Sequence, residues 1–356
     1  MAAAIKRVHP DLPIILTLHH LAHLSGVSAQ DLQEVAFRKV DAYRVFRVKK
    51  RGTPGKVPAP PRRYRTICVP HAFLMRTQRW IAQNVLRPID PHIASFAFAQ
   101  KRDLVGAAKR HLNSKWLLKM DVRHFFESVS EPQVYRVFRS LGYGALLSFQ
   151  MARICTRLPE HRRARSPYSK ERGDAALPYR RHALGHLPQG APTSPMLANL
   201  AMRSLDQRLT VLAQKEGWTY TRYADDLAFS RTDKSSRTAA THLSRHVARE
   251  LDAAALVNHR EKTSIAPPGA RKILLGVLID SDRPRLTREF RNNIETHLFA
   301  LTNIKIGPAA HRQKRGFAST IGMRRHVEGL IAFAHQVNPA YAAKLYRQFN
   351  AVDWTR

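Results

Sequence analysis

Two adjacent carboxylates lie in the middle of an otherwise apolar and aromatic segment of this chain. Residues 220–230 read YTRYADDLAFS, so Asp225 and Asp226 sit between two short runs of strand-forming residues, a pattern typical of a hairpin. Buried like charges raise each other's pKa values unless a hard cation with oxygen ligands neutralises them. The segment therefore predicts a Mg²⁺ site on a hairpin, and the alternative is a polar hairpin tip without a metal.

A third carboxylate follows a second apolar run. Residues 116–120 read WLLKM and lead into Asp121, which precedes the aromatic pair of VRHFF. This pattern predicts a buried strand whose end presents one carboxylate, although a simple cap at the strand end is the alternative for Asp121 alone. Three carboxylates can share two metal ions about 3.5–4 Å apart, an arrangement that supports phosphoryl transfer.

The charge balance makes these acids unusual in their own chain. Among 356 residues there are 60 Lys and Arg but only 26 Asp and Glu, which gives a formal net charge of +34. A hydrophobic content of 44% with four Trp and fifteen Phe excludes a disordered basic tail. A folded polycation of this kind predicts nucleic acid as the partner, because phosphates neutralise the charge and release counterions.

The remaining composition predicts a cytoplasmic protein that does not enter a membrane. Two cysteines, Cys68 and Cys155, match no zinc spacing and provide no disulfide framework. We find no secretion signal and no uncharged stretch approaching roughly 18 residues.

Local patterns divide the chain into three parts. Residues 1–113 begin with short helices, including a capping pattern at Ser28 and Asp31. Residues 114–280 hold the acidic strands and include a helical and basic-loop excursion at 131–185. Residues 281–356 are basic and helical, with Phe290, Ile294 and Leu298 on one face.

The first part contains a helix with an apolar face, and the first two parts each contain a basic loop. A helix after Pro70 carries Leu74, Ile81 and Val85 on one face and is expected to end at Pro88. Residues 49–63 and 156–185 are basic and contain proline, so we expect surface loops there.

Several motifs occur in the order found in one enzyme family. LPQGAPTSPMLANL at 187–200 resembles a Gln-Gly-x-Pro-x-Ser-Pro block, and YTRYADDLAFS resembles a Tyr-x-Asp-Asp hairpin. Arg65, Ile67 and Pro70 resemble a fingers element, while Asn258 and Lys262 resemble an Asn-x-x-x-Lys element. Across roughly residues 30 to 340 the chain resembles the reverse transcriptases, and specifically their retron-type branch.

The resemblance implies an α/β (α+β) fold with the right-hand polymerase architecture. Fingers would come from the N-terminal half, the palm from an antiparallel sheet, and the thumb from the C-terminal helices. The implied reaction is RNA-templated DNA synthesis from deoxynucleoside triphosphates. A structured noncoding RNA would serve as template and primer, an RNA-linked single-stranded DNA would be the product, and a defence effector protein would assist in antiviral defence.

The resemblance also implies roles for individual residues. Asp121 and Asp225 would hold two Mg²⁺ ions, with Asp226 more peripheral and the carbonyl of Val122 as a further ligand. Phe126 would be an aromatic gate against a ribose 2′-hydroxyl, and the alternative is ordinary core packing.

Four further residues would contact the incoming nucleotide. Gln189 and Gly190 would lie beneath it and the template, although Gly190 also fits a simple turn. Arg65 would neutralise the triphosphate, and Lys262 would lie near the leaving pyrophosphate as a proton donor. Either cation could instead be a solvated surface residue in so basic a chain.

Two elements depart from the retron pattern, and alternatives follow from them. An Asn-Ala-x-x-His element keeps its Ala108 and His111 but lacks Asn, and Leu274-Leu275-Gly276 replaces Val-Thr-Gly. The alternatives are another bacterial defence reverse transcriptase, a group II intron-like enzyme, and a catalytically silent RNA-binding scaffold.

One histidine cluster stands outside these motifs. His19, His20 and His23 include an i, i+4 pair that is able to chelate a metal. No carboxylate or Cys completes a ligand pattern nearby, so a helix surface near nucleic acid is the preferred interpretation.

Overall fold

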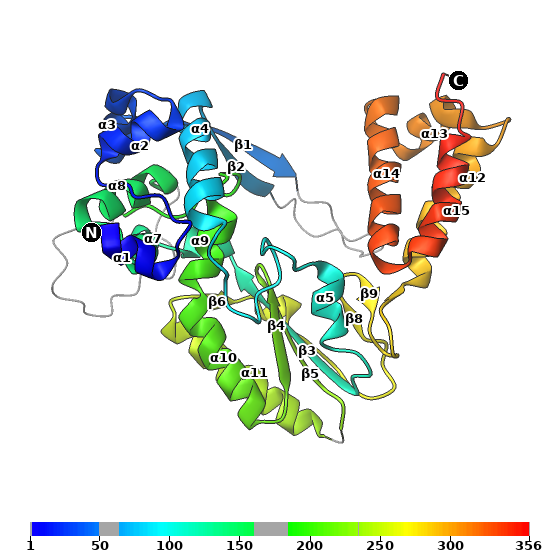
Figure 1. The fold of residues 1–356 in the computed structure, drawn as a ribbon. Helices are drawn as coiled ribbons and strands as arrows, with labels where there is room; N and C mark the ends of the chain where they lie inside the picture. The colour runs from blue at the N-terminus through cyan, green and yellow to red at the C-terminus, as the bar shows by residue number, and fades with distance from the viewer. Residues whose placement is uncertain (1, 50–63, 160–183, 234, 356) are drawn as a thin grey trace.

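The computed structural model describes residues 2–49, 64–159, 184–233 and 235–355. Its helices and strands form a mixed α/β fold shaped as a right hand (Figure 1), with N-terminal helices on one side, a sheet at the base and C-terminal helices on the other. Most of the two predicted basic loops, residues 50–63 and 160–183, lies outside the described residues.

The N-terminal lobe is built from short capped helices and a two-stranded ribbon. The helices are α1 (Ala2–Val8), α2 (Leu18–Ser25), α3 (Ala29–Ala36) and α4 (Ala72–Ile81), and the ribbon pairs β1 (Tyr43–Lys49) antiparallel with β2 (Tyr64–Pro70). The hydroxyl of Ser28 accepts a hydrogen bond from the Asp31 amide, which confirms the predicted cap of α3.

The helix predicted after Pro70 also forms. α4 continues into a π-helical turn, η1 (Ala82–Leu86), which ends before Pro88. Its predicted apolar face, Leu74, Ile81 and Val85, is fully buried in the core of the lobe.

The central sheet carries the acidic segments. Its strands are β3 (Trp116–Arg123), β4 (Thr219–Tyr223), β5 (Asp226–Arg231), β6 (Val257–Asn258) and β7 (Ser264–Ala266), in the order β4-β5-β3-β6 with β7 also paired to β3. β3 is antiparallel to each of its partners. Because alternate side chains point to opposite faces, Leu118 and Met120 join the main core while Leu117 joins a smaller cluster with Ala108.

Helices cover both faces of this sheet. α10 (Arg203–Lys215) and α11 (Arg237–Ala253) lie side by side on one face, and α5 (Leu104–Lys109) contacts β4 on the other (Figure 1). Four more helices, α6 (Phe125–Ser128), α7 (Glu131–Ser140), α8 (Ala145–Cys155) and α9 (Ser194–Ala201), connect the sheet to the N-terminal lobe. The helical part of the 131–185 segment thus packs against α3, α4 and α9.

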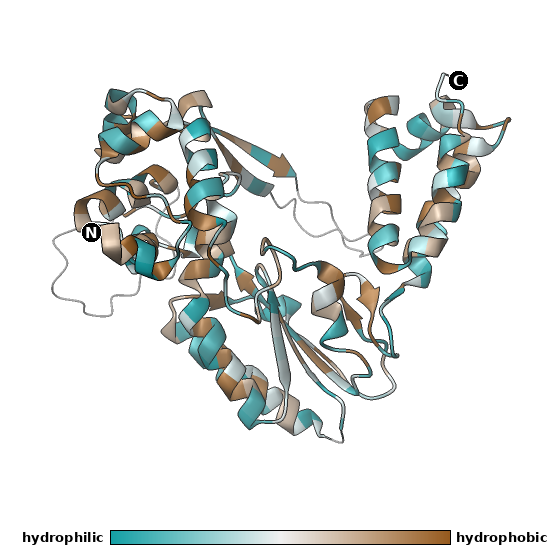
Figure 2. Cartoon of the chain, viewed as in Figure 1, coloured by the Kyte–Doolittle hydropathy of each residue, from teal (hydrophilic) through white to brown (hydrophobic). Residues whose placement is uncertain are grey.

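The C-terminal helices form a separate core. They are α12 (Arg288–Thr302), α13 (Gly307–Arg315), α14 (Thr320–Val337) and α15 (Pro339–Asn350). Ile294 and Leu298 of α12 are buried and Phe290 packs against them, as the sequence pattern predicts. Figure 2 shows apolar and polar residues alternating along these helices, as expected for amphipathic helices around a shared core.

A small sheet attaches these helices to the palm. Strands β8 (Ile273–Leu274), β9 (Val277–Leu278) and β10 (Arg285–Leu286) are antiparallel. The turn between β8 and β9 consists of Leu275 and Gly276, both with positive φ, as a two-residue hairpin turn requires. Leu274 and Val277 cluster with Phe333 of α14, so the segment Leu274-Leu275-Gly276, which replaces Val-Thr-Gly, joins the small sheet to the C-terminal helices.

No helix in the described ranges is long and apolar enough to cross a membrane.

Candidate active site

The sheet brings the three predicted carboxylates to one place. Asp121 of β3 is the register partner of Asp226 at the start of β5. The amide of Val122 donates to the carbonyl of Asp225 over 3.0 Å. Asp121 lies inside its strand rather than at the end, because Val122 and Arg123 continue the ladder with β6.

The hairpin turn between β4 and β5 has an unusual backbone. Ala224 adopts φ of +55°, a left-handed conformation that costs a residue with a Cβ free energy. This turn places Asp225 between the two strands and next to Val122. Tight pairing on both sides therefore maintains the geometry of the acidic pair.

The electrostatics of the site fit a bound cation. Burial raises the pKa of Asp226 to about 6, and the nearby charges of Asp225 and Asp121 add to this rise. The pKa of Asp225 is also raised, mainly by burial and less by Asp121. Carboxylates whose ionised forms are disfavoured in this way are stabilised by a hard divalent ion, and all three side chains offer only oxygen ligands.

Lys262 reaches the same acids from the next element. It lies in η3, a 3₁₀ turn (Arg260–Lys262), and its Nζ donates to Oδ2 of Asp121 over 2.7 Å. The turn is fixed because Asn258 pairs with Val122 and the His259 amide donates to the Asp121 carbonyl over 2.7 Å. The predicted Asn-x-x-x-Lys element therefore positions Lys262 beside β3.

The ribbon β1–β2 contributes Arg65 and contacts the Gln189–Gly190 loop. The positive charge of Arg65 lowers the pKa of Asp225, so this exposed cation faces the acids. The Cys68 amide donates to the Gln189 carbonyl over 2.8 Å.

The backbone conformation and the close packing at position 190 both require glycine. It has φ of +114°, and a Cβ there would lie 3.0 Å from Cγ2 of Ile67 and 3.1 Å from the carbonyl oxygen of Cys68. The close approach that Gly190 permits in this structure is thus to β2.

Phe126 lies on α6, five residues after Asp121. It is half-buried and packs against the main core, and its ring centroid lies 5.5 Å from that of Phe125 and 6.5 Å from that of Phe98. The gate and the packing interpretations of Phe126 therefore both fit its position.

Sequence reasoning missed a buried polar network behind the hairpin. Arg222 of β4 is 1% exposed and forms an ion pair with Asp206 of α10 at 2.6 Å. Its guanidinium also donates to the Ala224 carbonyl over 3.1 Å and to Asn199 and Ser95. One more arginine among 60 cations gave no sequence signal, yet Arg222 anchors the strained turn that carries the acids.

His111 supports the same hairpin from the other face. Its Nδ1 and Nε2 lie 2.7 Å from the hydroxyls of Ser230 and Thr221, so one imidazole joins β5 to β4. Burial lowers the pKa of His111 to about 3. The histidine of the altered Asn-Ala-x-x-His element is therefore a neutral side chain that holds together the two strands of the acidic hairpin.

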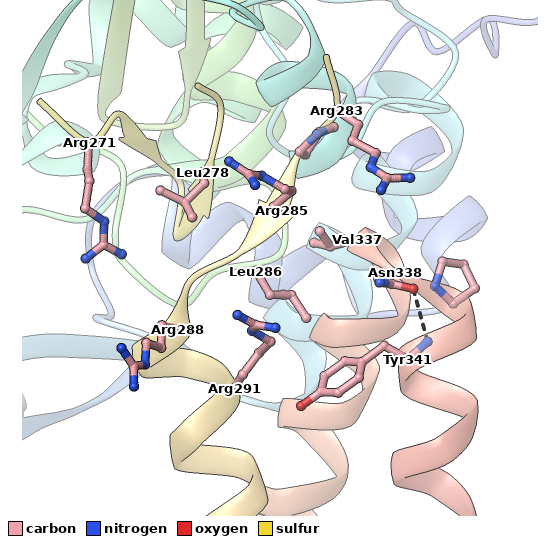
Figure 3. A pocket seen from close by; sticks show the side chains of 12 residues that line it. Arg271, Leu278, Arg283, Arg285, Leu286, Arg288, Arg291, Val337, Asn338 and Tyr341 are labelled. Atoms are coloured by element: carbon pink, nitrogen blue, oxygen red, sulfur yellow. Dashed lines mark hydrogen bonds between the residues drawn. The ribbon is translucent and has the colours of Figure 1, made fainter. Parts of the chain in front are cut away.

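A basic pocket of about 510 Å³ lies where the small β8–β9–β10 sheet meets α12 and the junction of α14 with α15. Figure 3 shows arginines of the small sheet and α12 on one side and Asn338 and Tyr341 on the other. Arg271 is paired with Glu289 and Arg285 with Asp280. Arg283, Arg288 and Arg291 form no ion pair within the part of the chain that the structure describes.

Comparison with known proteins places this site in a family. A family model described as reverse transcriptase (RNA-dependent DNA polymerase) matches residues 48–279. The chain is also 30% identical over 350 residues to the Retron Mx65 reverse transcriptase of Myxococcus xanthus, covering 95% of this chain and 72% of that one. The chain belongs to the retron-type reverse transcriptases. This reverse transcriptase is therefore an RNA-directed DNA polymerase.

Two further retron enzymes support the assignment. The chain is 28% identical over 291 residues to the Retron Ec86 reverse transcriptase of Escherichia coli, covering 81% of this chain and 80% of that one. It is 29% identical over 355 residues to the Retron Mx162 reverse transcriptase of Myxococcus xanthus, covering 94% and 67%. The altered elements at His111 and Gly276 are thus variations within the retron family, and the group II intron-like alternative is not retained.

Proposed function

We propose that this enzyme extends a primer by two-metal nucleotidyl transfer at Asp121, Asp225 and Asp226. The observation that carries the proposal is the convergence of three carboxylates, two of them with raised pKa values. Asp121 and Asp226 are paired across β3 and β5, and Asp225 lies in the adjoining turn beside Val122. A silent scaffold that binds RNA has no use for clustered acids facing a polyanion.

The donor set suits Mg²⁺. Asp121 and Asp225 would hold both ions, the carbonyl of Val122 would add a ligand, and Asp226 would contribute more peripherally. When bound, the ions supply an activated 3′-hydroxyl and neutralise the charge that develops on the α-phosphate. The chain itself holds Asp121 and Asp226 in register and pairs Asp121 with Lys262.

The residues around the acids are proposed to bind the deoxynucleoside triphosphate. Arg65 would pair with the triphosphate, and Lys262 would move from Asp121 to the leaving pyrophosphate and protonate it. Phe126 would exclude a ribose 2′-hydroxyl. Gln189 and Gly190 would support the nucleotide from the loop that β2 contacts.

The finer retron activities also belong to the proposal. A structured noncoding RNA would provide template and primer, and the product would be a single-stranded DNA joined to that RNA. Residues 1–113 would act as fingers, 114–280 as palm and 281–356 as thumb, with Arg283, Arg288 and Arg291 contacting phosphates. A defence effector would act with the complex against phage.

Substitution of the acids tests the proposed mechanism. Asp225→Asn with Asp226→Asn should abolish nucleotide incorporation while RNA binding persists, because the fold and the basic surfaces remain. The matched control is Asp252→Asn, which changes an exposed aspartate of α11. Wild-type rates in the Asp225 and Asp226 variant would refute the site assignment.

A second experiment tests the retron product. The protein is purified from its host, and the nucleic acid that copurifies is sequenced. A short DNA covalently joined to one specific RNA supports the proposed product, and unlinked complementary DNA contradicts it.

A further inference from the structure

Three potential metal ligands meet on the outer side of the palm, on residues that the polymerase chemistry does not use. Glu216 caps the C-terminal end of α10, and His242 and His246 lie four residues apart on α11. Residues i and i+4 of a helix share one face, so both imidazoles point to the same side. α10 packs beside α11 (Figure 1), and both histidines lie within ion-pair distance of Glu216.

The distances between the ligand atoms suit one small tetrahedral ion. Oε1 of Glu216 lies 2.9 Å from Nδ1 of His246 and 3.8 Å from Nδ1 of His242. One ligand atom from each residue can be chosen so that all three lie within 4.8 Å of one another. Ligands bound to Zn²⁺ at about 2.0–2.1 Å in a tetrahedron are roughly 3.4 Å apart, and the two measured distances lie on either side of this value.

The surroundings leave the Glu216 carboxylate available to a cation. The guanidinium of Arg231 donates to the Glu216 backbone carbonyl and forms an ion pair with Asp233 rather than with the Glu216 carboxylate. The carboxylate itself has only the two imidazoles as polar partners among the residues that the structure describes. Two imidazoles and one carboxylate are ligands that suit Zn²⁺ rather than Mg²⁺.

We propose that Glu216, His242 and His246 bind Zn²⁺, with water as the fourth ligand beside the exposed His242. The ion crosslinks the C-terminal end of α10 to α11, next to the turn through Gly217 that leads into β4. Because β4 is the first strand of the acidic hairpin, the bound ion stabilises the start of that strand without contacting substrate. The proposal does not depend on the assignment of the three aspartates.

The chain contains a matched control for this site. His19 and His23 form the same i, i+4 pair on α2 and are both exposed, but no carboxylate or Cys in the described residues joins them as a third ligand. Loss of His19 and His23 therefore removes two imidazoles without removing a complete ligand set.

Zinc titration of the purified full-length protein tests the proposal, with Mg²⁺ in excess to occupy the aspartate site. The wild type and the His19→Ala, His23→Ala control should each bind one tight equivalent of Zn²⁺. His242→Ala and Glu216→Gln should each weaken this binding at least about tenfold. Zn²⁺ should raise the melting temperature of the wild type and the control but not of His242→Ala.

Cobalt provides a second, spectroscopic measurement that does not depend on stability. Co²⁺ bound to the wild type should give the intense visible absorption of a tetrahedral site, and His246→Ala should lose it. Zinc binding that is equally tight in His242→Ala, or that disappears with His19 and His23, would overturn the proposal. If Glu216, His242 and His246 form only a hydrogen-bonded cluster, the wild type would bind no tight equivalent of Zn²⁺ and would give no tetrahedral Co²⁺ absorption, and the proposal would be wrong.

Discussion

Lys262 Nζ and Asp121 Oδ2 form an ion pair of 2.7 Å across the junction of β3 and the 3₁₀ turn η3. Asp121 is buried whereas the side chain of Lys262 is 55% exposed, so the lysine can leave while the acid stays in place. The pair thus links the acid proposed to hold metal with the cation proposed to meet the leaving group. Lys262 also acts to lower the pKa values of Asp225 and Asp226, against the raising effect of their burial.

Replacement of Lys262 should separate binding of metal from catalysis. Lys262→Met should lower kcat by about 10²- to 10⁴-fold, the usual contribution of a general acid. It should also lower the Mg²⁺ concentration for half-maximal activity, because Asp121 loses a competing cation. Arg260→Met, which removes an exposed cation from the same turn, is the control. A fall in kcat of equal size in both variants would indicate a general effect of charge.

Substitution of Phe126 should relax sugar selection. Phe126→Ala removes the ring proposed to exclude the ribose 2′-hydroxyl, so the ratio of ribonucleotide to deoxynucleotide incorporation should rise by roughly ten- to two-hundredfold. The control is Phe98→Ala, which removes the neighbouring exposed ring. The ratio of kcat/KM values for the two nucleotides is the measurement. Unchanged selection with lowered stability would assign Phe126 to core packing alone.

The Arg222–Asp206 pair should be costly to break. Arg222→Met leaves the Asp206 carboxylate, which is 0% exposed, without its cation, and removal of one partner of a buried pair costs about 3–5 kcal/mol. Urea unfolding measures this loss. The double variant Arg222→Met, Asp206→Leu should recover much of the stability but not the activity, because the Ala224 turn still lacks its anchor. Full recovery of nucleotide incorporation would show that the turn does not need Arg222.

Local patterns predicted the parts of this molecule that depend on neighbours in the sequence. The cap at Ser28, the buried face of α4 and the apolar face of α12 follow from periodicity and capping chemistry. The acids were found because carboxylates in apolar segments are rare in a chain of net charge +34.

Contacts between distant segments could not be predicted in the same way. Nothing in the local sequence indicates that Arg222 pairs with Asp206. Nothing in it indicates that Glu216 contacts His246 either, because the packing of α10 against β4 and α11 decides both contacts. His111 was recognised only as a family residue, and its role appeared when both strands of the hairpin were in place.

Protonation of His111 should couple stability to pH. The pKa of His111 is about 3 in the fold, below the ordinary value of 6.5, so the unfolded chain takes up a proton below pH 6.5 that the folded chain does not. Stability should therefore fall as the pH falls, and His111 alone should account for about 2 kcal/mol between pH 7 and pH 5. Urea unfolding at both pH values should show that His111→Gln removes this part of the dependence. An equal dependence in the variant and the wild type would exclude His111 as its source.

A single methyl group at Gly190 should disturb the contact between the fingers and the nucleotide site. Gly190→Ala places a Cβ 3.0 Å from Ile67 Cγ2 and 3.1 Å from the Cys68 carbonyl at φ of +114°, where residues with a Cβ are strained. The expected loss of stability is about 1–3 kcal/mol. Because β2 also carries Arg65, its displacement should raise KM for the deoxynucleotide more than it lowers kcat. Ala191→Gly, which adds no atoms to the next position, is the control, and steady-state kinetics with a homopolymer template is the measurement. An unchanged KM in a destabilised Gly190→Ala protein would mean that Gly190 serves only the turn.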